Sequence, residues 1–149
     1  MEKMNFSINI NALKEKVWNT LWEDQSYRKW TSAFTEGSYA VTDNWKEGTK
    51  VLFLDPKGSG MVSTVAENRP NEYMSFKHLG EVKDGTEDTT SEQAKQWSGA
   101  TENYTLKDTG TGTELKVEMQ GNISGDFKEY FLNAWPEALE KVKKLAEEK

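Results

Sequence analysis

The sequence contains no cysteine and only one histidine, His78. Without cysteine the chain has neither a disulfide framework nor thiol chemistry, and a Cys/His metal site is excluded. A Ser-His-Asp triad would have to use His78, and no serine lies in a nucleophile-elbow pattern. We therefore expect no metal and no cofactor, and the sequence offers no recognisable catalytic motif.

Clusters of basic residues and long apolar runs are also missing. The chain has 19 Lys and Arg against 25 Asp and Glu, a net charge of −6, and its positive charges form no patch. This balance argues against a nucleic-acid partner. No apolar run approaches the roughly 18 residues of a membrane-spanning helix, and the first residues do not resemble a secretory signal. These absences predict a cytoplasmic protein without membrane insertion.

The sequence is instead rich in aromatic residues, with six Trp, five Tyr and six Phe in 149 residues, a length that suits one domain spanning 1–149. Residues 125–149 predict one long helix with Asp126 as its N-cap, continuous but bent at Pro136. At about 100° per residue its apolar side chains share one face: Phe127, Tyr130, Phe131, Ala134, Trp135, Ala138, Leu139, Val142, Leu145 and Ala146. A stripe of this width must be covered, and the β-rich region before it is the only candidate.

The first third of the chain predicts a strand followed by two helices. Apolar residues alternate over 4–10, which indicates a half-buried strand. Asn11 is the expected cap of a helix that ends near Trp22. Residues 25–32 predict a second, short helix from which Trp30 packs inward.

Six further strands are predicted between glycine, proline and asparagine breaks, over 37–42, 49–55, 60–68, 73–80, 99–108 and 113–121. The breaks are short, and 109–112 forms a hairpin turn, so neighbouring strands should be antiparallel. The polar segment 81–98 is either mobile or carries a short helix around 92–97. The predicted order is one strand, two helices, six strands and a long helix. This is an α+β fold with an antiparallel sheet, and a pocket is expected between sheet and helix.

Alternation along three of these strands predicts which side chains face the helix. The inward sets are Met74, Phe76 and His78; Glu102, Tyr104 and Leu106; and Leu115, Val117 and Met119. One histidine and one glutamate thus face inward, where an unpaired charge is costly. Two interpretations stay open: His78 and Glu102 lie near the sheet edge and reach solvent, or they are the polar groups of an otherwise apolar pocket.

Several segments together resemble the SRPBCC superfamily, and most closely its branch related to the C-terminal domain of the activators of the heat-shock chaperone ATPase (AHSA-like). The segments are FSININ–ALKEKVWNTL, YRKWTSAFTEGSY, DNWKEGTKVLF, ENYTLKDTGTGTELKV and DFKEYFLNAWPEALEKVKKLAE. The shared signatures are Trp30 before Gly37, Trp45 with Gly48, and Trp135-Pro136. The resemblance covers essentially the whole chain. It implies a helix-grip fold, in which a curved antiparallel sheet wraps around the long C-terminal helix and leaves an internal cavity.

Three functions follow from the residues and the resemblance together. The leading hypothesis is non-enzymatic binding of a small hydrophobic or amphipathic ligand, with His78 and Glu102 orienting its polar end. The expected lining is Phe53, Met74, Phe76, His78, Glu102, Tyr104, Val117, Met119, Phe127, Phe131 and Trp135. The alternative is a stress-related chaperone cofactor, whose partner is a chaperone and which acts through its surface. The third is a cyclase- or aromatase-type enzyme with His78 and Glu102 as acid and base.

Overall fold

The computed structural model describes residues 2–121 and 125–148. The elements in chain order are β1 (Glu2–Ile10), α1 (Lys14–Trp22), α2 (Asp24–Trp30), the 3-10 turn η1 (Thr31–Ala33), β2 (Tyr39–Thr42), β3 (Lys50–Leu54), β4 (Gly60–Arg69), β5 (Tyr73–Lys83), β6 (Thr86–Asp88), α3 (Glu92–Lys95), β7 (Thr101–Asp108), β8 (Thr113–Gly121) and α4 (Gly125–Glu147). This order agrees with the predicted arrangement of a strand, two helices, a run of strands and a long final helix.

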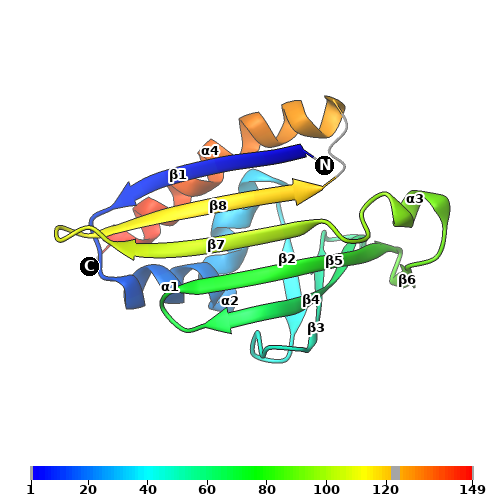
Figure 1. The fold of residues 1–149 in the computed structure, drawn as a ribbon, viewed down its shortest axis with the longest axis horizontal. Helices are drawn as coiled ribbons and strands as arrows, with labels where there is room; N and C mark the ends of the chain where they lie inside the picture. The colour runs from blue at the N-terminus through cyan, green and yellow to red at the C-terminus, as the bar shows by residue number, and fades with distance from the viewer. Residues whose placement is uncertain (1, 122–124, 149) are drawn as a thin grey trace.

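The strands form one curved antiparallel sheet in the order β1-β8-β7-β5-β4-β3-β2, with β6 paired to β5. Figure 1 shows α4 crossing behind β1 and β8, while α1 and α2 cover the same face of the sheet. At the far edge β3 and β2 turn back behind the sheet, where β2 contacts α2. The sheet does not close on itself, so the architecture is an α+β helix-grip fold, as predicted.

The segment between β5 and β7 contains more secondary structure than its composition suggests. β5 continues to Lys83 and turns through Asp84 and Gly85, both with positive φ, into β6. In the part of the chain that the structure describes, the strands after α2 therefore number seven rather than the predicted six. Of the two alternatives for 81–98, the structure has the short helix α3, capped by the Ser91 hydroxyl, which accepts from the Ala94 amide at 3.1 Å.

Two predicted helix caps are wrong. α1 begins at Lys14 rather than directly after Asn11, and its cap residue Leu13 makes no side-chain bond. The backbone amide of Asn11 instead donates to Glu147 Oε2 at 2.8 Å, so this residue joins β1 to the end of α4. α4 begins at Gly125, which places Asp126 inside the helix instead of before it.

The core lies between the sheet and the helices. Among the side chains of α4 that the structure describes, six are buried: Ala134, Trp135, Ala138, Leu139, Val142 and Ala146. From α1, the Trp22 ring packs edge-on against Phe76 and Tyr104, with ring centroids 5.5 and 4.9 Å apart. Trp30 is 1 % exposed and its indole N–H donates to the Leu21 carbonyl at 3.1 Å, which confirms that it packs inward.

Within residues 2–121 and 125–148, none of the helices combines the length and the apolar character needed to cross a bilayer.

α4 runs without interruption through Pro136, as predicted, and the proline lies on the exposed side of the helix. Since proline has no N–H, the Leu132 carbonyl lacks its normal partner within the helix. We expect Pro136→Ala to raise the free energy of unfolding by about 1 kcal/mol or more, because proline disfavours a helix interior by about 3 kcal/mol relative to alanine. Urea unfolding measures the change. Glu137→Ala, at the next exposed position, restores no hydrogen bond and should change little. Destabilisation by Pro136→Ala would contradict this account of the helix.

Candidate functional site

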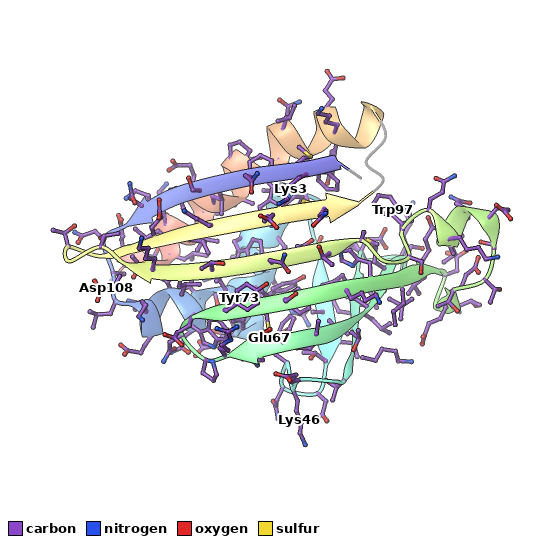
Figure 2. The ribbon with its side chains drawn as sticks, in the orientation of Figure 1. Lys3, Lys46, Glu67, Tyr73, Trp97 and Asp108 are labelled. Atoms are coloured by element: carbon purple, nitrogen blue, oxygen red, sulfur yellow. The ribbon has the colours of Figure 1, made fainter. Side chains whose placement is uncertain are left out.

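A cavity of about 350 Å³ lies between the sheet, the α2–η1 segment and the first half of α4. Its lining comes from elements far apart in the sequence. Tyr27, Trp30 and Thr31 come from the α2–η1 segment, and Phe34, Thr35, Ser38 and Tyr39 follow it. The sheet and its loops contribute Phe53, Leu54, Asp55, Ser59, Gly60, Met61, His78, Trp97, Ala100, Thr101, Glu102, Tyr104, Met119, Gln120 and Gly121, and α4 contributes Tyr130, Phe131 and Trp135. Figure 2 shows Trp97 at the opposite end of the sheet from Asp108, so the cavity lies away from the β7–β8 turn.

Aromatic rings around Trp135 form one wall of the cavity. The Trp135 ring centroid lies 4.8 Å from that of Phe34, 6.0 Å from that of Tyr104 and 6.2 Å from that of Trp30. Its indole N–H donates to the Met119 sulfur at 3.0 Å. The ring is therefore fixed by contacts with α2, β7 and β8, and this wall is preformed.

His78 and Glu102 supply the polar side of the cavity. The imidazole Nε2 of His78 lies 3.7 Å from Glu102 Oε1, and the two side chains are 5 % and 16 % exposed. The Ser63 hydroxyl lies 2.6 Å from Nδ1 of His78, and the Tyr104 hydroxyl donates to Glu102 Oε2. A chain of polar groups thus runs from Ser63 on β4 through His78 and Glu102 to Tyr104.

Strand register explains why these groups meet. The His78 amide donates to the Ala100 carbonyl at 2.8 Å, which holds the middle of β5 beside the start of β7. On the other side of β5, the register of β4 shifts between Val62 and Ser63, so that Ser63 stands directly opposite His78. Paired residues project to the same face of a sheet, and the shift thereby supplies the histidine with a buried partner.

The buried tyrosines next to Glu102 have raised pKa values. Burial is the main cause of the raised pKa of Tyr104, and the charge of Glu102 and the hydrogen bond to it add to the effect. Burial also raises the pKa of Tyr27, with a further contribution from the Glu102 charge. Both hydroxyls therefore stay protonated at neutral pH, and Tyr104 remains a hydrogen-bond donor to the carboxylate.

The chemistry available at this site is limited. Ser63 is fully buried and is not part of the lining, so its hydroxyl positions His78 rather than facing a ligand. In the parts of the chain that the structure describes, no three His, Asp or Glu side chains are grouped to hold a metal ion. What the geometry provides is an aromatic enclosure with a carboxylate and an imidazole on one side.

The structure brings most of the predicted site residues to the cavity: Phe53, His78, Glu102, Tyr104, Met119, Phe131 and Trp135. Met74, Phe76 and Val117 also point inward, but they are at most 1 % exposed, lie in the packed core and are not part of the lining. Alternation predicts which face of the sheet a side chain points to, but not which helix covers it. Over these three residues the sheet is covered by α1, whose Trp22 ring packs against Phe76. The side chain of Phe127 lies outside the described residues.

Sequence reasoning missed the contribution of the α2 region to the cavity. Tyr27, Trp30, Phe34 and Tyr39 all line it. The sequence does indicate this contribution. It predicts a short helix over 25–32 with Trp30 inward, and such a helix has to cover part of the sheet. The pairing of Ser63 with His78 could not be predicted in this way, because a strand bulge leaves little trace in the alternation of apolar and polar residues.

Comparisons with known proteins identify similar chains. The family described as "Activator of Hsp90 ATPase homolog 1-like protein" matches residues 11–147. The Aha1 dimer of Colwellia psychrerythraea is 20% identical with a TM-score of 0.74, and the match covers 99% of this chain and 97% of that one. Protein CV1439 of Chromobacterium violaceum is 17% identical with a TM-score of 0.69 over 100% of both chains.

A third similar structure is the AHSA1-like protein of Aeromonas hydrophila, at 14% identity and a TM-score of 0.70, with 98% of this chain and 92% of that one covered. No curated protein matches the sequence significantly. At these identities the solved structures support the fold and leave the function to be argued from the site.

Replacing Ser63 tests the polar chain. Ser63→Ala leaves Nδ1 of His78 without its buried partner, and we expect the free energy of unfolding to fall by about 1–3 kcal/mol. Ser7→Ala removes a hydroxyl from an exposed position of β1 and should stay within about 0.5 kcal/mol of the parent. Urea unfolding of both variants gives the comparison. Equal effects would show that the Ser63–His78 contact adds nothing to stability.

Alkaline titration tests the environment of Tyr27 and Tyr104. The folded pKa of each lies above its unfolded value, so above about pH 10 the unfolded chain loses protons that the folded chain keeps. The free energy of unfolding should therefore fall as pH rises, and the tyrosinate absorbance of these two residues should appear only with unfolding. Absorbance and near-ultraviolet circular dichroism, recorded together, measure this. Full ionisation of every tyrosine in a still-folded protein would contradict it.

Proposed function

Since the chain belongs to the Activator of Hsp90 ATPase homolog 1-like family, we propose that it binds a small amphipathic ligand in the cavity between sheet and helix, without transforming it. The observation that carries the proposal is an aromatic-lined space of about 350 Å³ with a carboxylate on one side. Protein interiors are otherwise close-packed, and a space of this size is at the lower end of the range for small-molecule sites.

The shape of the site supports an amphipathic ligand over a wholly apolar one. Trp30, Phe34 and Trp135 offer an apolar wall on which a hydrocarbon or ring can pack. His78 and Glu102 form a polar part of the same lining and are only 5 % and 16 % exposed, so a polar end group of the ligand would satisfy them. A ligand with one apolar and one polar end therefore matches both parts of the lining at once.

Filling this space also has an energetic consequence. A ligand that binds only the folded chain recovers contacts with the lining and stabilises the fold by mass action. The same cavity thus supports a binding role and an increase in stability when the ligand is present.

The second candidate is a chaperone cofactor, and the observation that favours it is the family match, whose description names activators of the Hsp90 ATPase. This role would use the outer surface of the protein, so variants inside the cavity should leave it unchanged. Measuring Hsp90 ATPase activity with and without the protein tests the role. Stimulation that survives substitution of the cavity lining would favour this candidate over ligand binding.

Two substitutions on α4 separate a ligand cavity from a packed core. Phe131 is a partly buried lining residue, so Phe131→Ala should lower ligand affinity but cost less stability than the usual 3–5 kcal/mol of a buried phenylalanine. Leu139 is 2 % exposed and is not part of the lining, so Leu139→Ala should cost about 2–5 kcal/mol of stability. Urea unfolding and tryptophan-fluorescence titration with amphiphiles measure the two effects.

Native mass spectrometry of gently purified protein complements these variants. We expect a small amphipathic molecule to co-purify with the parent protein and to be depleted in Phe131→Ala. If no ligand co-purifies, no amphiphile gives a saturable fluorescence change, and Phe131→Ala costs as much as a core substitution, the binding proposal is wrong.

A further inference from the structure

The cavity lining carries carboxylates without lysine or arginine partners. Among the described residues the lining contains two carboxylates, Asp55 and Glu102, and one imidazole, His78, but no Lys or Arg. Asp55 Oδ1 accepts hydrogen bonds from the backbone amides of Lys57 and Ser59, at 2.8 and 3.0 Å, so this carboxylate is engaged in its own turn. Glu102 bonds instead to Tyr104, whose ring belongs to the aromatic wall, so it is the carboxylate that a ligand packed on this wall meets.

One oxygen of Glu102 has spare capacity to accept hydrogen bonds. Oε2 accepts the Tyr104 hydroxyl, whereas Oε1 stands 3.7 Å from Nε2 of His78, too far for a hydrogen bond. The side chain is only 16 % exposed, so bulk water reaches it poorly. A largely buried carboxylate needs a partner that offsets its lost hydration, and a cation is the most effective one.

The aromatic wall next to this carboxylate also favours a positive charge. Tyr104 joins the two features, because its hydroxyl bonds to Glu102 and its ring lies 6.0 Å from that of Trp135. Trp30 and Phe34 pack around the same indole. Tryptophan, tyrosine and phenylalanine rings carry negative charge on their faces and attract ammonium groups, and cages of such rings bind organic cations.

We propose that the ligand of this cavity is an amphipathic amine, whose protonated nitrogen binds Glu102 Oε1 while its apolar body packs on the wall formed by Trp30, Phe34 and Trp135. The inference rests on the proposed function, because it takes the cavity to be the binding site. An amphiphile with a carboxylate or phosphate would meet the Glu102 charge, and the described lining contains no Lys or Arg to offset that repulsion. The one imidazole of the lining, His78, stands beside Glu102 itself, 3.7 Å from its Oε1.

The guanidinium of Arg28, close to one lining residue, does not change this conclusion. The guanidinium of Arg28 lies 5.3 Å from the ring centroid of Tyr39, a lining residue, but Arg28 is not part of the lining. Its Nε pairs with Asp24 at 3.0 Å on the surface of α2. Its charge is thus directed to an exposed carboxylate rather than to the cavity.

Three probes with the same hydrocarbon chain test the proposal: octylammonium, octan-1-ol and octanoate, titrated into the protein at pH 7 by calorimetry. Octylammonium should bind about tenfold more tightly than octan-1-ol or better, because charge-assisted hydrogen bonds are about twice as strong as neutral ones. Octanoate should bind most weakly.

Two charge-removing variants locate the effect. Glu102→Gln keeps an acceptor for the Tyr104 hydroxyl but removes the charge, so the affinity for octylammonium should fall about tenfold while that for octan-1-ol is unchanged. Glu118→Gln removes the same charge from the outer face of β8, where Glu118 pairs with Lys3 at 3.7 Å, and should leave all three affinities unchanged. If Glu102→Gln fails to fold, the three probes on the parent protein decide the question alone.

The outcomes separate the inference from the function on which it rests. If octan-1-ol or octanoate binds as tightly as octylammonium, or if folded Glu102→Gln binds octylammonium like the parent, the amine proposal is overturned and a ligand-binding function stands. If none of the three probes binds, the amine proposal is overturned, and the ligand-binding function is overturned with it when no ligand co-purifies and Phe131→Ala costs as much stability as a core substitution.

Discussion

The structure depends on covering the apolar face of α4. Trp135 is the residue of this face whose ring contacts most of the covering elements. Its ring contacts β1 through Phe6, α2 through Trp30, the chain after η1 through Phe34 and β7 through Tyr104. Because several rigid rings converge on one indole, they fix the helix at a set distance from the sheet. Beyond this point α2 and α4 enclose space rather than fill it, and the cavity is the result.

The two halves of the interior consequently differ. Beside α1 the sheet is closely covered, and side chains such as Met74, Phe76 and Leu115 are completely buried. Toward Trp97 the cover is looser, and His78 and Glu102 lie where they meet the cavity. Stability is concentrated in the packed half, which leaves the open half able to hold polar groups that a close-packed core would exclude.

Regular patterns in the sequence predicted the parts of the fold that repeat. The helical period of α4, the alternation that turns His78 and Glu102 inward, and the short breaks that make the sheet antiparallel could all be read directly. Irregular features could not. Neither the bulge that sets Ser63 opposite His78 nor the hydrogen bond that takes the Asn11 amide to Glu147 follows from a period. The division between core and lining also depends on which helix lies above each strand position, and that is a tertiary property.

The central claim is that the open half of the interior binds a ligand, and the indole N–H resonances of the protein test it most directly. Trp30 and Trp135 line the cavity, whereas Trp18 lies outside it on α1. Titration of isotope-labelled protein with octylammonium should shift the signals of Trp30 and Trp135 saturably and leave that of Trp18 in place. Signals that do not move, or that all move together without saturation, would contradict the claim.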